Sequence, residues 1–160
     1  MRCCCIQCVK PTWRQCSVSD FVLDSQLAAD CHVLGELDAG LLLLLNNALV
    51  PWFILVPMTE VSELYQLDED LQRSVWQEIT CLSEFVQASF AVEKLNVAAI
   101  GNKVRQLHIH IVGRHSDDYC WPGVVWGAEG RADYSPEQVR NIVSQLEDGY
   151  RGRFRANPAA

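Results

Sequence analysis

The sequence predicts a single α+β domain: a five-stranded antiparallel sheet, one long helix packed on it and a further helix near the C-terminus. Three observations predict this. Short aliphatic or aromatic runs recur between turn residues, as strands do. Apolar residues repeat at helical spacing over residues 68–94. A capping box at residues 135–138 begins another helix. A run of strands bracketed by helices is typical of α+β proteins.

The first elements are a short helix and a hairpin. Asp24 is a capping residue and predicts a helix through Asp30. "CHVLGEL" (31–37) and "LLLLL" (41–45) follow as two antiparallel strands. The glycine of the 38–40 connection suits the left-handed position of a three-residue hairpin loop. "WFILV" (52–56) is a β-branched and aromatic run between prolines, which predicts a buried third strand.

The second half continues with a long helix and two more strands. We expect the helix to start after Asp68 and end near Lys94, with its apolar stripe at Leu71, Val75, Ile79, Leu82 and Val86. "LNVAAI" (95–100) resumes strand character and "QLHIHIV" (106–112) runs back as the last strand of a meander. After the Ser135 capping box, Pro136 to Gly149 forms the last helix.

Composition and charge restrict the class of protein. The chain has 160 residues, 49% of them hydrophobic, which suits one sizeable core and not two. Its net charge of −7 repels polyanions, so we expect no nucleic-acid partner. The longest apolar tract, Leu41 to Leu45, is far shorter than the roughly 20 residues that span a bilayer. We therefore expect a cytoplasmic protein with no membrane partner.

The two ends of the chain are expected to lie outside the packed domain. Five of the eight cysteines fall within the first sixteen residues, so residues 1–19 are interpreted as a disordered, Cys-rich extension with reduced thiols. The Cys5-Ile-Gln-Cys8 pair has the spacing of half a zinc site, but no second half follows. Residues 151–160 show no periodicity and are predicted to form a loose tail, which leaves 20–150 as the domain.

The "QLHIHIV" strand carries the most informative chemistry. Side chains alternate across a strand, so Gln106, His108 and His110 share one face, while Leu107, Ile109 and Ile111 point into the core. Two chemistries suit such a face: a zinc ion held by the two histidines, or an imidazole that attacks phosphorus. Further metal ligands would have to come from His32, His115 or Asp117-Asp118, whose spacing does not single any of them out.

"QLHIHIV" resembles the histidine triad motif, H-φ-H-φ-H-φ-φ with φ apolar, of nucleotide hydrolases and transferases, with Gln106 in place of the first histidine. The resemblance covers roughly residues 20–127, and the trailing "WPGVVWG" is similar to a bacterial branch of the family. It implies that His108 attacks the α-phosphorus of a nucleoside phosphate and forms a covalent nucleotidyl-histidine, which water then cleaves. The tautomer of His108 would be set by a carbonyl of a neighbouring strand, and His110 would donate to the phosphate oxygens.

The resemblance also implies binding residues and partners. Gly101-Asn102-Lys103 matches the family's phosphate-binding stretch, with Asn102 as the contact, and Asn46 or Asn47 falls near its ribose-binding position. No cofactor or metal is implied. The expected substrate is a purine nucleotide or a dinucleoside polyphosphate, and the expected assembly is a homodimer.

Two departures from the family pattern affect these expectations. Gln106 can donate a hydrogen bond but cannot shuttle a proton, so a leaving group of low pKa is favoured. Trp52 stands where some members carry a further supporting histidine. The alternatives are a His-x-His metal-dependent enzyme and a nucleotide-binding module whose catalysis is weak or lost.

Overall fold

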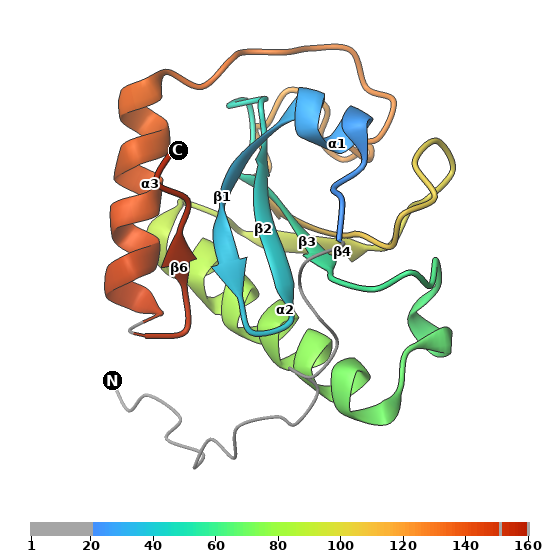
Figure 1. Cartoon of the computed structure of the whole chain (residues 1–160). Coiled ribbons are helices and arrows are strands. Elements are labelled where there is room, and N and C mark those ends of the chain that lie inside the picture. Colours follow the sequence, from blue (N-terminus) through green and yellow to red (C-terminus); the bar gives the residue numbers. More distant parts are fainter. Residues whose placement is uncertain (1–20, 151, 160) are drawn as a thin grey trace.

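The computed structural model describes residues 21–150 and 152–159, so the predicted Cys-rich extension lies outside the described residues (Figure 1). The α+β class is confirmed. The elements in chain order are α1 Ser25–Asp30, β1 Cys31–Leu37, β2 Gly40–Leu45, β3 Trp52–Pro57, the 3-10 turn Leu64–Gln66, α2 Glu69–Ser89, β4 Lys94–Ala98, β5 Ile109–Arg114, α3 Pro136–Gly149 and β6 Arg155–Ala156.

The strands form one antiparallel sheet in the order β4-β5-β3-β2-β1-β6. The predicted meander is therefore wrong, because β5 lies between β3 and β4 instead of at the edge. All six residues of β5 are buried, whereas β4 has exposed and half-buried residues only. A strand that is buried on both faces gains most from an interior position, and the long connection through α2 between β3 and β4 allows β5 to pair between them.

The sheet has six strands where the sequence predicted five, because part of the predicted loose tail is ordered. Arg155 and Ala156 pair with β1, and Phe154 is buried in the main core. This pairing needs Gly35, since a Cβ there would lie 2.2 Å from the carbonyl oxygen of Arg155. The tail shows no periodicity because two distant features hold it in place. These are the burial of Phe154 and its close approach to Gly35, about 120 residues earlier.

Helices α2 and α3 cover one face of the sheet (Figure 1), and apolar side chains from both helices and from that face form the main core. The opposite face carries a second apolar cluster, which includes Leu27 of α1, Trp52, Val112 and Val125. The predicted starts of both longer helices are confirmed by their N-caps, with Asp68 accepting from the N–H of Leu71 and Ser135 from the N–H of Gln138. The two faces of β5 therefore meet different environments.

Two local expectations are wrong in detail. Helix α2 ends at Ser89 and not near Lys94, because the chain from Phe90 is extended and Glu93 donates its N–H to the Arg114 carbonyl. Gly40 is not in the left-handed region; it is the first residue of β2. A Cβ on Gly40 would lie 2.1 Å from the carbonyl oxygen of Val56, so this glycine permits close approach of β3.

Candidate active site

The motif residues alternate across the sheet as predicted. Leu107, Ile109 and Ile111 belong to the main core beneath α2 and α3. The side chains of His108 and His110 are also buried, with 5% and 7% of their surfaces exposed, and their rings stand 4.9 Å apart in a T-shaped arrangement. The strand proper begins only at Ile109, so Gln106 to His108 precede the first residue paired in the sheet. The two imidazoles are therefore neighbours, but only His110 is held by the ladder.

The tautomer of His108 follows from its one polar contact with a described residue. Its Nδ1 lies 2.6 Å from the backbone carbonyl oxygen of Gln106. A carbonyl oxygen only accepts, so Nδ1 carries a proton, and in the neutral ring Nε2 has the lone pair. A carbonyl was expected here from a neighbouring strand, but it comes from two residues earlier in the same stretch. A neutral imidazole with a free Nε2 is the form that can act as a nucleophile.

His110 is held in the opposite tautomer. Trp52 donates its indole N–H to His110 Nδ1 over 2.9 Å, inside the protein. Since Nδ1 accepts, the proton of the neutral ring resides on Nε2, which makes that atom a donor. Burial, with a smaller contribution from His108, lowers the pKa of His110 to about 4, so the ring is neutral near pH 7. The pair thus offers one lone pair and one N–H donor.

Two tryptophans pack against His110 on the face away from the long helices. The rings of Trp52 and Trp126 both lie edge-on to His110, at 5.7 and 5.6 Å, and 5.6 Å from each other. The indole N–H of Trp126 is buried and has no hydrogen-bond partner among the described residues. Trp126 belongs to the stretch "WPGVVWG", so the segment after β5 covers the second histidine.

A cavity of about 560 Å³ opens beside His108. It brings the predicted phosphate-binding residues Gly101, Asn102 and Lys103 together with His108 and Gln106, and its wall is completed by Arg105, Leu107, Ala99, Ile100, Ser62 and Glu63. Lys103 and Arg105 are exposed and form no ion pair with any described residue. In a chain of net charge −7 these two cations favour an anion beside His108.

Gln106 lies in the cavity wall, yet its side-chain amide is bonded to main chain. Its Oε1 accepts from the N–H of Asp24 and its Nε2 donates to the carbonyl of Val22, both over 2.9 Å. These bonds join the segment before α1 to the motif. The residue at the first motif position is therefore fixed in orientation by a distant part of the chain.

Asn46 and Asn47 do not line this cavity. Asn47 donates to the carbonyl of Gly130 and accepts from the N–H of Ala132. Asn46 Oδ1 accepts from the N–H of Tyr134 and lies 3.1 Å from His32 Nε2. Both asparagines therefore hold the segment that leads to α3, and their contact with a ribose stays a prediction.

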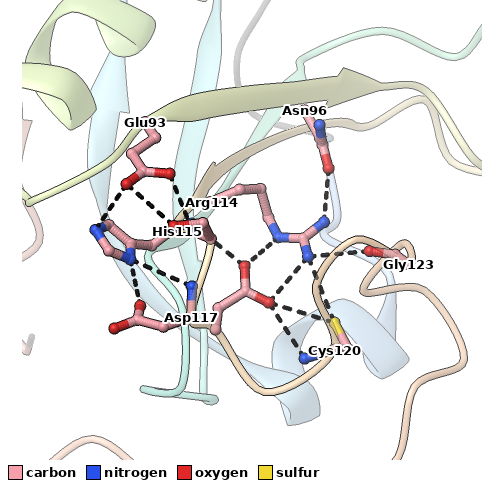
Figure 2. A network of polar contacts seen from close by, with 9 residues as sticks. Glu93, Asn96, Arg114, His115, Asp117, Cys120 and Gly123 are labelled. Atoms are coloured by element: carbon pink, nitrogen blue, oxygen red, sulfur yellow. Dashed lines mark hydrogen bonds and ion pairs between the residues drawn. The ribbon is translucent and has the colours of Figure 1, made fainter.

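A buried cation holds the segment after β5 (Figure 2). Arg114 is only 2% exposed, and Figure 2 shows its guanidinium between Asn96 of β4 and the carbonyl of Gly123. It also makes two hydrogen bonds of 2.7 and 2.9 Å to the carboxylate of Asp118, and this pairing lowers the pKa of Asp118 to about 2. The network fixes the beginning of the segment that carries Trp126 over His110.

Trp52 and Arg114 gain roles that the sequence did not assign to them. The signal at Trp52 was the family resemblance, which implies a supporting histidine at this position in some members. Among residues 21–150 and 152–159, no group of three or more His, Cys, Asp or Glu side chains is arranged to hold a metal ion. No helix in the same ranges is long and apolar enough to cross a membrane.

Comparisons with known proteins agree with this fold. The model of the HIT domain family matches residues 26–117. A histidine triad protein from Marinobacter aquaeolei is 40% identical, with a TM-score of 0.77 over 81% of this chain and 95% of its own. Those from Bradyrhizobium japonicum (35% identical, TM-score 0.77, 81% and 97%) and Sinorhizobium meliloti (31%, TM-score 0.79, 82% and 98%) are also similar. No curated protein matches.

Proposed function

The chain belongs to the histidine triad (HIT) domain family, and from this premise we propose that it is a nucleotide hydrolase or nucleotidyl transferase with His108 as its nucleophile. The observation that carries the proposal is the pair of opposite tautomers: the Nδ1 contacts leave a lone pair on Nε2 of His108 and an N–H on Nε2 of His110. A fold-level likeness alone would support nucleotide binding and not chemistry.

The proposed reaction has two displacements at the α-phosphorus. His108 Nε2 attacks, a P–N bond forms, and the P–O bond to the leaving group breaks. The positive charge on the imidazole is stabilised because Nδ1–H still donates to the Gln106 carbonyl. His110 Nε2–H donates to a non-bridging oxygen as charge develops there. Water, or an acceptor hydroxyl in a transferase, then attacks phosphorus. The P–N bond breaks and returns its electron pair to His108 Nε2, and the proton of the attacking hydroxyl passes to solvent.

The leaving group must depart without a strong acid beside it. Gln106 cannot supply a proton, and its amide is held by the segment before α1. A phosphate leaving group of low pKa departs as an anion and needs no proton from the protein. We therefore propose a purine nucleotide or a dinucleoside polyphosphate as substrate, with the phosphates near Asn102, Gly101 and Lys103.

Covalent trapping tests this proposal. Acid-free quenching during turnover of an α-labelled nucleotide should leave label on His108 as an acid-labile phosphoramidate. His108→Ala should lose the label and about 10⁴ or more in rate, and His110→Ala on the order of 10²–10³, as for one lost oxyanion donor. The exposed His115, outside the cavity, provides the control His115→Ala, which should retain both. Equal labelling of the wild type and His108→Ala would overturn the proposal. Nucleotide affinity without labelling would indicate a binding module instead.

We also propose a homodimer. Strand β4 forms an edge of the sheet, and its Val97 is 42% exposed. An edge strand presents unpaired N–H and C=O groups that a second copy can bond.

A further inference from the structure

We propose that Gln106 is a positioning residue: its side-chain amide joins the segment before α1 to the carbonyl that orients His108. The inference rests on the proposed function, since it assigns how the nucleophile is held. It concerns contacts between residues 22–24 and 106–108, which are more than 80 positions apart in the chain.

The first step is the chemical fit between Gln106 and the main chain. The carbonyl of Val22 and the N–H of Asp24 flank Leu23, and each needs a partner when water is displaced. Gln106 supplies both a donor and an acceptor at 2.9 Å from one planar group. Glutamate of the same length offers acceptors only. The amide therefore supplies the donor and the acceptor that a neighbouring strand would otherwise supply to this segment.

The second step is that packing holds residues 21–24 in a fixed position. Phe21 and Leu23 pack against the second apolar cluster, whereas the side chain of Val22 is 78% exposed and contributes no anchor. Between described residues, the two bonds to Gln106 are the only hydrogen bonds that join residues 21–24 to the stretch around the motif. The segment is therefore held by packing from one side and by Gln106 from the other.

The third step is what Gln106 itself holds. Its backbone carbonyl accepts from His108 Nδ1 at 2.6 Å, and residues 106–108 lie before the first paired residue of β5. No sheet ladder supports that carbonyl. The two side-chain bonds fix the residue that bears it, together with the buried Leu107. Loss of these bonds should let the carbonyl turn away, after which either nitrogen of His108 can carry the proton.

Two kinds of variant remove the hydrogen bonds between Gln106 and residues 22–24, one kind at Gln106 and the other at Asp24. Gln106→Met keeps the length of the side chain and removes both bonds, and Gln106→Glu keeps only the acceptor. Asp24→Pro removes the N–H, and the φ of −53° at Asp24 lies in the range of the proline ring. Its matched control is Asp24→Ala, because both variants lose the side chain that caps α1 but only the proline variant loses the N–H.

The direct measurement is the ¹⁵N chemical shifts of the His108 ring in the ligand-free full chain, which report which nitrogen carries the proton. We expect Nδ1–H in the wild type and in Asp24→Ala, and a mixture in Gln106→Met, Gln106→Glu and Asp24→Pro. kcat should fall roughly fivefold to tenfold in these three with a smaller change in KM, as expected for one lost orienting contact.

The outcomes separate this inference from the proposed function. An unchanged His108 tautomer in both Gln106→Met and Asp24→Pro would overturn the coupling, even if His108 is labelled during turnover. A changed tautomer in a protein whose His108 is never labelled would support the coupling and reject the nucleophile. If Gln106→Met does not fold, equal tautomers in Asp24→Pro and Asp24→Ala still overturn the inference.

Discussion

Replacing Trp52 by phenylalanine should release the second histidine from its tautomer. The variant keeps an aromatic ring in a buried position but removes the N–H that His110 Nδ1 accepts. A buried acceptor left unsatisfied costs about 1–3 kcal/mol, and the smaller ring adds about 1 kcal/mol for the space it leaves. We expect Trp52→Phe to lower the free energy of unfolding by about 2–4 kcal/mol.

The same change should alter the protonation of His110. In the wild type a second proton on this ring would have to displace the indole N–H from Nδ1, which opposes the charged form in addition to burial. The pKa of His110, lowered to about 4 in the wild type, should therefore rise in Trp52→Phe. The Nε2–H that donates to phosphate is no longer enforced, and kcat at neutral pH should fall roughly tenfold, the equivalent of one hydrogen bond.

Trp126→Phe is the matched control, because Trp126 lies at nearly the same distance from His110 but its indole N–H has no partner among the described residues. Urea unfolding, steady-state kinetics and ¹⁵N shifts of His110 as a function of pH provide the assays. The reasoning is refuted if His110 titrates alike in the two variants, or if both lose the same activity.

Five further outcomes are expected. Asp118→Asn should cost about 3–5 kcal/mol in urea unfolding, because it breaks a buried pair with Arg114. In the wild type the stability that this pair provides is present above the ordinary carboxyl pKa near 4 and should be lost as pH falls towards 2, which unfolding at successive pH values will show. Gly40→Ala should lower thermal stability by about 1–3 kcal/mol, since its Cβ meets the backbone of Val56. Activity should survive EDTA, because the proposed attack uses imidazole; stoichiometric zinc whose removal abolishes activity would favour the metal enzyme instead. Light scattering should give the mass of a dimer, and a monomer at tens of micromolar would contradict the proposed assembly.

The sequence determined the features of this protein that depend on neighbours within a few residues. Alternation along residues 106–112 placed the aliphatic side chains in the core and both histidines on the other face, because strand geometry fixes the period at two. Asp68 and Ser135 marked the beginnings of α2 and α3, because a capping oxygen bonds an N–H only two or three residues away. The spacing of the motif histidines pointed to the family because it too is a local pattern, in which His108 and His110 lie two residues apart.

The tertiary structure decided the contacts between distant parts of the chain. The position of β5 inside the sheet, the pairing of the C-terminal tail with β1 and the bond from Trp52 to His110 depend on which elements come to lie side by side. Local periodicity carries no information about that order. The sequence marked Gln106 as a departure at the first motif position, but only the folded chain brings it to Val22 and Asp24. The histidines were therefore predictable as a pair, whereas their tautomers were not, since a tautomer follows from the partner of each ring nitrogen.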